Sequence, residues 1–251
     1  MNIDKYLERI NYKGSTSPNL TNLKTIHKNH LYSIPFENLD IHNKKKIVLD
    51  PNSVEQKILN SFRGGYCYEL NGLFNSFLKE LGYNTKMVSA RVSNGKGSWG
   101  EEFDHMANIV ELDELWMADV GFGDSFIEPI TVTLDKPQKN LNGWYKISQN
   151  REDEYLKMSK STDNTIYNDE FIFTLKDRAW NEFEGMNTYH QTSPDSHFTR
   201  GRVCSIAIED GRVTLNDNKL TITKGDKKNI SEVKDEKEFI GKLYEYFKIK
   251  L

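Results

Sequence analysis

Cysteine is scarce in this sequence. Among its 251 residues only Cys67 and Cys204 occur, too few for a disulfide framework, and they do not form the CxxC pair typical of zinc sites. No apolar run approaches the about 20 residues that a membrane-spanning helix needs, and the first residues lack the charged and then apolar pattern of a signal peptide. We therefore expect a cytoplasmic chain, in which an isolated cysteine in a distinctive setting is a candidate nucleophile.

An excess of charge of one sign is also missing. The 34 Lys and Arg residues nearly balance the 37 Asp and Glu residues, with a formal net charge of −3. Nothing in this balance indicates a nucleic-acid or membrane-surface partner. Aromatic residues make up 12% of the chain, which argues against disorder and suits an aromatic-lined pocket. The length allows one large domain or two to three small ones.

The first third of the chain has helical periodicity. The clearest apolar repeat covers residues 70–81 and is followed by Gly82, a helix-closing residue. Ser17, directly before a proline, is a candidate N-cap for an earlier helix. Ser53 with Gln56 forms a capping-box pattern. We therefore predict a helical segment up to about residue 83.

Beyond residue 83 the pattern changes to that of short strands. Residues 85–92, 105–111 and 115–120 are rich in Val, Ile, Met and Trp. Further short strands are expected at residues 143–148, 154–158, 171–175, 203–208, 212–215 and 219–223. Strands at this density predict a barrel or a sandwich-like sheet. Residues 232–248 have the pattern of a closing amphipathic helix.

Cys67 lies between a Gly-Gly turn, Gly64 and Gly65, and the predicted helix that follows. At a helix start, free backbone N–H groups and the positive end of the helix dipole stabilise an anion. A thiol in that place is biased toward the reactive thiolate. An inert buried cysteine is the alternative; it fits Cys204, which lies in a strand-like segment, better than Cys67.

A thiolate nucleophile needs a base, and the base needs an orienting acceptor. Of the six histidines, His105 opens a strand, and Asp119 ends an apolar run in the next strand. If the two strands form a hairpin, an odd-numbered turn around Asp113 puts both side chains on one face, whereas a two-residue turn separates them. A structural histidine remains the alternative for His105 taken alone. Gly121 and Gly123 follow Asp119 and could present backbone N–H groups to a phosphate or an oxyanion, or form an ordinary tight turn.

Together these residues resemble the arylamine N-acetyltransferase family. The matching segments are Pro-Phe-Glu-Asn-Leu at residues 35–39, Arg-Gly-Gly-Tyr-Cys at 63–67, Glu-Leu-Asn at 69–71, His105, Asp-Val-Gly-Phe-Gly at 119–123, Asn-Thr-Tyr at 187–189 and Thr-Ser-Pro-Asp-Ser-His-Phe at 192–198. The resemblance implies an α+β fold with a Cys-His-Asp core like that of cysteine proteases. Its parts would be a helical bundle at residues 1–83, an antiparallel β-barrel at 84–187, and an interdomain segment with a mixed α/β lid at 188–251.

The resemblance also implies a ping-pong acetyl transfer from acetyl-CoA, as co-substrate, to an arylamine or arylhydrazine, with no tightly bound cofactor, no metal and no obligate protein partner. The implied catalytic residues are Cys67 as nucleophile, His105 as base and Asp119 as orienting carboxylate. Asn71 would hold the carboxylate, and Arg63 would anchor the nucleophile loop. The implied acceptor-pocket wall is Phe36, Phe122 and Phe126. The implied contacts along the CoA arm are Gly121, Gly123, Ser193 and Ser196.

Three residues depart from the pattern of some relatives. Glu101 and Glu102 precede His105 where a CoA pyrophosphate would be repelled if they faced it, and Asp124 stands where other residues help to set acceptor preference. Two other classes of protein would fit the same sequence features. One is a thiol hydrolase of the transglutaminase or peptidase type, which shares the fold; the other is a non-catalytic CoA-binding or structural protein.

Overall fold

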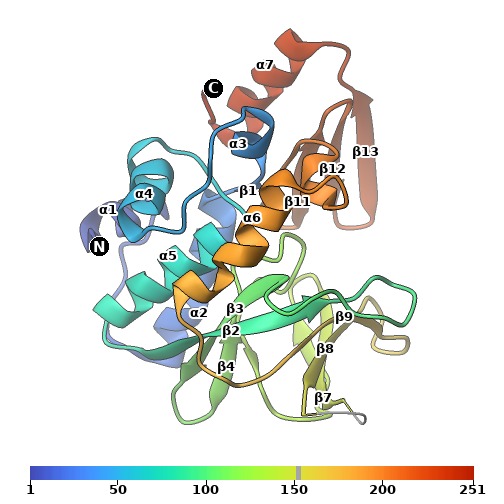
Figure 1. Ribbon diagram of the computed structural model, residues 1–251. Coiled ribbons are helices and arrows are strands. Elements are labelled where there is room, and N and C mark those ends of the chain that lie inside the picture. The colour runs from blue at the N-terminus through green and yellow to red at the C-terminus, as the bar shows by residue number, and fades with distance from the viewer. Residues whose placement is uncertain (151–153) are drawn as a thin grey trace.

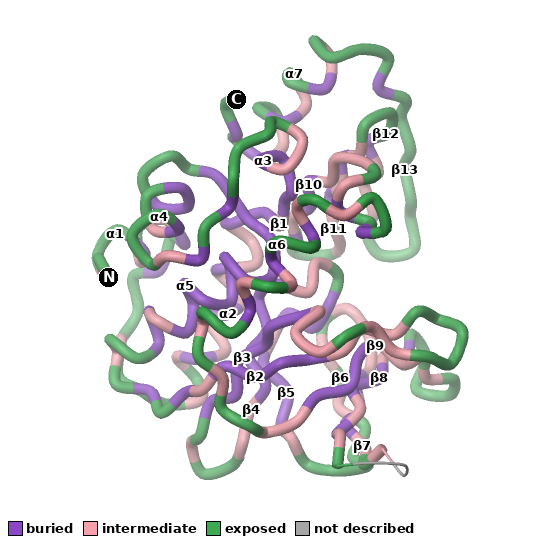
Figure 2. Tube along the Cα trace, in the orientation of Figure 1, coloured by how far each residue is buried: buried purple, intermediate pink, exposed green. Residues whose placement is uncertain are grey.

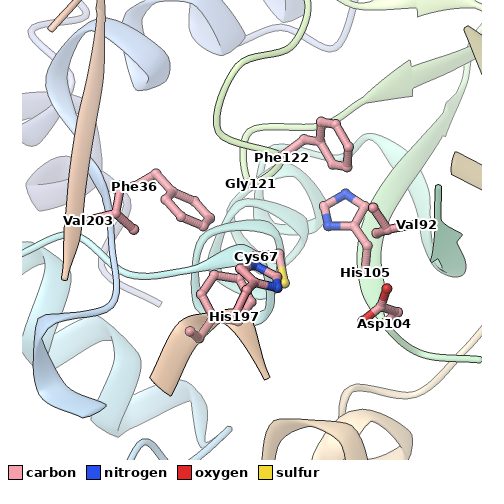
Figure 3. Close-up of a pocket in the computed structure, with 10 residues that line it drawn as sticks. Phe36, Cys67, Val92, Asp104, His105, Gly121, Phe122, His197 and Val203 are labelled. Carbon is pink, nitrogen blue, oxygen red and sulfur yellow. The ribbon is translucent and has the colours of Figure 1, made fainter. Parts of the chain in front are cut away.

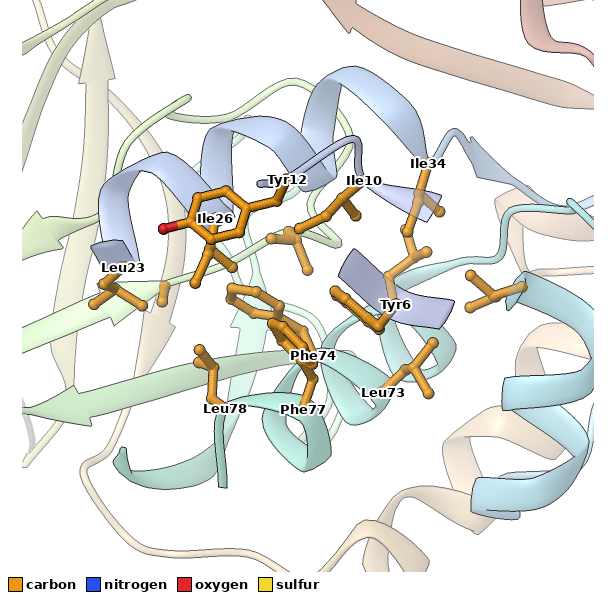
Figure 4. Close-up of a cluster of buried hydrophobic side chains, with 14 of the residues drawn as sticks. Tyr6, Ile10, Tyr12, Leu23, Ile26, Ile34, Leu73, Phe74, Phe77 and Leu78 are labelled. Atoms are coloured by element: carbon orange, nitrogen blue, oxygen red, sulfur yellow. The ribbon is translucent and has the colours of Figure 1, made fainter. Parts of the chain in front are cut away.

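The N-terminal helices pack around the long helix α5 (Figure 1). The helical elements of this part are α1 (Ile3–Arg9), α2 (Leu20–Ser33), α3 (Leu39–His42), α4 (Pro51–Glu55), the π-helical turn η1 (Gln56–Asn60) and α5 (Cys67–Glu80). This computed structural model describes residues 1–150 and 154–251. Figure 4 shows side chains of α1, α2 and α5 meeting in one core, in which Tyr6 stacks on Phe77 with ring centroids 3.9 Å apart. Because α5 is buried in this core, the position of its first residue, Cys67, is fixed.

Two helix starts differ from the prediction. Asn19, rather than Ser17, caps α2, because its side chain accepts the backbone N–H three residues further on at 2.9 Å. Asp50 caps α4 by accepting the N–H of Ser53 at 2.9 Å, so Ser53 lies inside the helix and not at its N-cap. The end of α5 agrees with the prediction, since Gly82 follows it in the left-handed conformation, with φ +86°.

The middle of the chain forms one eight-stranded antiparallel sheet that curls into a barrel. Its strands are β2 (Asn84–Val92), β3 (His105–Glu111), β4 (Leu115–Ala118), β5 (Ile130–Thr131), β6 (Gln138–Asn140), β7 (Gly143–Gln149), β8 (Leu156–Ser161) and β9 (Asn168–Phe173), in the order β5-β4-β3-β2-β9-β8-β7-β6. The two end strands meet through one side chain: Gln138 accepts the Thr131 N–H and donates to the Thr131 carbonyl oxygen, both at 2.8 Å. β5 and β6 were not predicted, because two or three residues are too few to show periodicity.

The C-terminal sheet includes a strand from the N-terminal part. Its order is β1 (Phe36–Glu37), β10 (Val203–Ile208), β11 (Gly211–Asn216), β12 (Lys219–Lys224) and β13 (Lys227–Glu232), all antiparallel. The short helices η2 (Trp180–Phe183), α6 (Glu184–Thr192) and η3 (His197–Thr199) lead into this sheet, and α7 (Glu236–Phe247) covers it. All six residues of β13 are exposed (Figure 2), so the strand lacks the apolar alternation that would have revealed it. Its last residue, Glu232, is also the first residue of the segment predicted as the last helix.

These three parts confirm the predicted α+β fold of helical bundle, antiparallel barrel and mixed lid. Helix α5 packs against β2 and β3, and Figure 2 shows the buried part of the trace concentrated there. Across the described residues, every helix is too short or too polar to cross a membrane. The predicted boundaries near residues 83 and 187 stay predictions, and the β1–β10 pairing joins the first segment to the last.

Candidate functional site

Cys67 is the first residue of α5 and is only 3% exposed. The preceding loop passes so close to Pro35 that position 64 must be glycine, because a Cβ there would lie 1.9 Å from the carbonyl oxygen of Pro35. The Tyr66 N–H donates to a Glu69 carboxylate oxygen at 3.2 Å, which caps the helix start. The structure thus gives Cys67 the place at the N-terminus of a buried helix that the sequence predicts.

A buried cluster of charges anchors this loop. Arg63 donates twice to Oε1 of Glu37, at 3.1 and 2.8 Å, and also lies 3.0 Å from Asp40. Lys57 donates to Glu69 at 2.8 Å and reaches Asp40 at 2.9 Å. Burial alone would lower the pKa of Lys57, but the three carboxylates outweigh burial and raise it. Because each charge has a partner, the cluster fixes the strand β1, the turn before Cys67 and the first turn of α5 relative to one another.

His105 and Asp119 meet on one face of the β3–β4 hairpin. Glu111 pairs with Leu115 across a three-residue turn, so Asp119, just beyond β4, falls opposite Ala107 when the register is extended. Ala107 and His105 are two residues apart and therefore share a face. The odd-numbered turn required by the sequence argument is present, and His105 Nε2 lies 2.7 Å from Asp119 Oδ2.

The Asp119 carboxylate is fully buried and has a donor for each oxygen. Oδ2 accepts from His105, and Oδ1 accepts from the Asn71 side chain at 2.8 Å and from the Gly121 N–H at 2.9 Å. Burial alone would raise the pKa of this carboxyl, but the imidazole and the two N–H donors outweigh burial and lower the pKa below its ordinary value. Asp119 is thus held as a carboxylate that orients the imidazole.

Gly121 brings this hairpin end into contact with the start of α5. A Cβ at this position would lie 2.8 Å from the Cα of Cys67 and 2.6 Å from the side-chain nitrogen of Asn71. Only glycine permits this approach. Since His105 Nε2 is engaged by Asp119, its other ring nitrogen, Nδ1, is the one left to act on the thiol.

Cys67, His105 and Gly121 all line one cavity of about 310 Å³ (Figure 3). Most of its remaining wall is apolar and consists of Phe36, Val92, Phe122, Phe198 and Val203. Burial raises the pKa of the Cys67 thiol well above its ordinary value, and hydrogen bonds from the backbone N–H groups of Met106 and Tyr68 oppose this effect. The helix start alone therefore does not ionise Cys67, and the thiol depends on a base to take its proton.

Three side chains that the resemblance places in the acceptor pocket or along the CoA arm do not line the cavity. Phe126 is fully buried in the barrel core, where it stacks near His27, and it is absent from the cavity wall, unlike Phe36 and Phe122. The Ser196 hydroxyl is buried and bonded to His190 Nδ1 at 3.0 Å, so it does not face the cavity. The Ser193 hydroxyl accepts the Asp195 N–H at 3.2 Å in the loop after α6.

Two of the three acidic residues that depart from the family pattern form ion pairs, and none of the three lines the cavity. Glu102 pairs with Arg178 at 3.1 Å and accepts the Tyr155 hydroxyl at 2.8 Å, while Glu101 is exposed. Asp124, next to Gly123 at φ +90°, lies 3.4 Å from Lys160 and 3.5 Å from Arg212. Within the described ranges, no group of three His, Cys, Asp or Glu side chains is placed to hold a metal ion.

Other polar residues of the site are not predicted by the sequence. Asp104 and His197 line the cavity, but a carboxylate next to a histidine and a histidine in a turn carry no signal of this by themselves. His27, on α2, is buried behind Asp119. Its contacts lie 92 and 100 residues away in the sequence, so only the fold reveals them.

Comparison with known proteins places this site in a family. The model of an N-acetyltransferase family matches residues 19–251. An arylamine N-acetyltransferase of Escherichia coli is 32% identical over 223 residues, which cover 88% of this chain and 76% of the relative. The chain belongs to the arylamine N-acetyltransferase family. Its members are acetyltransferases, which confirms the enzyme class predicted from the sequence motifs.

Solved structures of the family agree. The arylamine N-acetyltransferase of Salmonella typhimurium superposes with a TM-score of 0.91 at 28% identity, covering 98% of this chain and 90% of that one. The Mycobacterium marinum enzyme, solved in complex with CoA, gives a TM-score of 0.90 at 25% identity and covers 99% of this chain and 93% of that one. Acetyl-CoA is accordingly the co-substrate of this family.

Proposed function

We propose that this protein transfers an acetyl group from acetyl-CoA to the nitrogen of an arylamine or arylhydrazine, through an acetyl thioester on Cys67. The observation that carries the proposal is the 2.7 Å contact between His105 and Asp119, buried in the cavity that Cys67 also lines. In this proposal Cys67 is the nucleophile, His105 the general base and Asp119 the carboxylate that orients it. Asn71 fixes Asp119, and Arg63 anchors the loop before the nucleophile.

In the first half-reaction, His105 takes the thiol proton as the Cys67 sulfur attacks the thioester carbonyl carbon. The bond between that carbon and the CoA sulfur breaks, and the CoA sulfur leaves with the proton from His105. Acetyl-Cys67 remains. The Cys67 backbone N–H, at the start of α5, would stabilise the oxyanion. Since one thioester replaces another, the step needs little driving force.

In the second half-reaction, the acceptor nitrogen attacks the acetyl carbon of acetyl-Cys67, and His105 takes a proton from that nitrogen. The bond between the acetyl carbon and the Cys67 sulfur breaks, and His105 returns the proton to the sulfur, which restores the thiol. Aromatic amines are weakly basic and largely neutral at pH 7, hence nucleophilic. The rings of Phe36 and Phe122 on the cavity wall suit an aromatic acceptor. Phe126 would support the wall from the barrel core.

The proposed path of the CoA arm runs past the segment that follows Asp119. Gly121 lines the cavity, and Gly123 follows in a left-handed turn, so their backbone would flank the pantetheine or pyrophosphate. Ser193 would lie farther along the arm. Ser196 acts there only indirectly, because its hydroxyl is engaged by His190. We place the enzyme in the cytosol, where reduced thiols and acetyl-CoA are present.

The test is to incubate the protein with acetyl-CoA alone and measure its mass. We expect one added acetyl group, mapped to Cys67, with release of one equivalent of CoA, and transfer of that group when an arylamine is added. Cys67→Ala should show neither, while Cys204→Ala should behave as the wild type because Cys204 is buried in β10.

Each alternative predicts a different result. A thiol hydrolase would accumulate no acetyl-Cys67 and would cleave an amide or ester substrate instead. A non-catalytic CoA-binding protein would bind CoA, and Cys67→Ala would not change any arylamine acetylation observed. Either result would overturn the proposal.

A further inference from the structure

Asp104 brings a carboxylate into the cavity that holds the nucleophile. It directly precedes His105 and lines the same cavity as Cys67, with its side chain 20% exposed. Figure 3 shows its carboxylate near the imidazole of His105 and the sulfur of Cys67. Next to burial, which is the largest cause, the charge of Asp104 raises the pKa of Cys67, as expected of a neighbouring carboxylate.

A buried histidine lies against this carboxylate. His190 Nε2, on α6, lies 3.2 Å from Asp104 Oδ1, and His190 Nδ1 lies 3.0 Å from the Ser196 hydroxyl. The Ser196 oxygen also accepts the Phe198 N–H at 3.3 Å. The Asp104 carboxylate is thus linked to α6 and to the loop after it through His190 and Ser196.

No permanently positive side chain among the described residues lines the rest of the cavity, so none would stabilise a bound anion. Ten described residues line it, and none of them is Lys or Arg. His197 also lines it, but burial lowers the pKa of His197, so it is neutral at pH 7. The wall opposite is aromatic or aliphatic. An acceptor bound against Cys67 is therefore exposed to one carboxylate and to no lining Lys or Arg at low local dielectric.

We propose that Asp104 sets the charge class of the acceptor, so that the cavity takes neutral or cationic aryl amines and hydrazines and discriminates against acceptors with an anionic ring substituent. This inference rests on the proposed acetyl transfer. A carboxylate on the acceptor ring would lie about 10 Å or less from Asp104, where two like charges cost on the order of 10-fold in affinity at protein-like dielectric.

The experiment compares two acceptors of nearly equal shape, 4-aminobenzamide and 4-aminobenzoate. The ratio of their kcat/KM values is measured for the wild type and for Asp104→Asn. The intrinsic reactivity difference between the two amines is the same in both proteins, so it cancels when the ratios are compared. We expect the ratio of amide to acid to fall by about 10-fold in Asp104→Asn. A cationic acceptor, 4-(aminomethyl)aniline, should lose relative rate in the same variant.

Two further variants isolate the charge. Asp104→Glu keeps the carboxylate and should keep most of the discrimination. Glu101→Gln removes a nearby carboxylate that is exposed and does not line the cavity, and it should leave the ratio unchanged. An unchanged ratio in Asp104→Asn, or an equal change in Glu101→Gln, would overturn the inference.

The formation of acetyl-Cys67 from acetyl-CoA, followed by mass without any acceptor, separates this inference from the proposed function. If the wild type forms acetyl-Cys67 but Asp104→Asn leaves the acceptor ratio unchanged, only the role of Asp104 fails. If the wild type forms no acetyl-Cys67, the acetyl-transfer proposal itself fails.

Discussion

At the scale of single residues, the proposed chemistry depends on a proton that moves between two buried groups, Cys67 and His105. Burial opposes a free Cys67 thiolate. Transfer of the proton to His105 leaves the net charge of the cavity unchanged, and the Asp119 carboxylate, 2.7 Å from the imidazole, stabilises the imidazolium that forms. The apolar cavity therefore penalises the thiolate alone far more than the thiolate–imidazolium pair.

Alkylation of Cys67 by iodoacetamide tests this pairing. In the wild type, reactivity should persist below pH 7, because the proton goes to His105. In His105→Gln the thiol must ionise alone, and because burial raises its pKa, the rate should rise only at pH values above the range of a free thiol. At pH 7 we expect His105→Gln to react at least about 10-fold more slowly than the wild type.

The alkylated residue is identified by peptide mapping. Cys204 is fully buried in β10, so Cys67→Ala should take up no label in the native state. Superimposable pH profiles for the wild type and His105→Gln would show that His105 does not share a proton with Cys67.

The pairing of His105 with Asp119 could be argued from the sequence, because strand alternation and the length of one turn decide it. The reactive state of Cys67 could not, since a helix start predicts a lowered pKa while burial, which depends on the whole fold, raises it. The position of Phe126 was also beyond the sequence. Four residues after Phe122, it follows the chain into the barrel core.

At the scale of elements, the segment between β4 and β5 carries the orienting carboxylate and part of the cavity wall. His27, on α2, contacts this segment at both ends: Nε2 lies 3.1 Å from the Asp119 carbonyl oxygen, and Nδ1 lies 2.9 Å from the Ile127 carbonyl oxygen. Burial lowers the pKa of His27 to about 4. The ring is then neutral at pH 7, so its single N–H serves one of the two carbonyl oxygens at a time.

Replacement of His27 by Leu should therefore impair both stability and catalysis. The two buried carbonyl oxygens lose their donor, at about 1–3 kcal/mol in the free energy of unfolding. The backbone of Asp119 loses its support, and kcat/KM should fall by about 10-fold, since small displacements of catalytic groups are costly. Urea titration and steady-state acetyl transfer measure the two effects.

His30→Leu is the matched control. His30 lies one turn further along α2, is equally buried, and bonds the Tyr6 hydroxyl at 2.5 Å instead of the active-site segment. It should lose stability while the folded enzyme keeps its kcat. Equal losses of kcat in the two variants would contradict a specific role for His27.

The pH dependence of stability gives a second check on His27. Its pKa is about 4 when folded, against an ordinary value of 6.5. Between these values the unfolded state binds more protons, so the wild type should lose stability as the pH falls from 6.5 to 4. His27→Leu should lose less over that range, as measured by urea midpoints in a pH series.

At the scale of the whole molecule, the lid is tied to the N-terminal part by the chain's own connectivity. β1 is an edge strand of the C-terminal sheet. Asn38, which follows it, donates to the carbonyl oxygens of Phe198 and Gly201, both at 2.9 Å, and accepts the Val203 N–H at 2.8 Å. The motif that contains Asn38 was recognised by resemblance, but its structural purpose was not visible in the sequence, because its partners lie about 160 residues away.

These contacts predict that the lid does not open separately when the protein unfolds, and the chain offers a separate probe for each part. The four tryptophans, Trp99, Trp116, Trp144 and Trp180, all lie outside the C-terminal sheet and its covering helix. In Cys67→Ala the only thiol is Cys204, buried in β10. Tryptophan fluorescence and thiol labelling of Cys204 should therefore show the same urea midpoint in this variant. Asn38→Ala in the same background removes three side-chain hydrogen bonds across the parts, and Cys204 should then become labelled at lower urea than the fluorescence change. Labelling of Cys204 ahead of the fluorescence change with Asn38 intact would show that the lid is an independent unit, and that the sheet shared through β1 is too weak to couple it to the barrel.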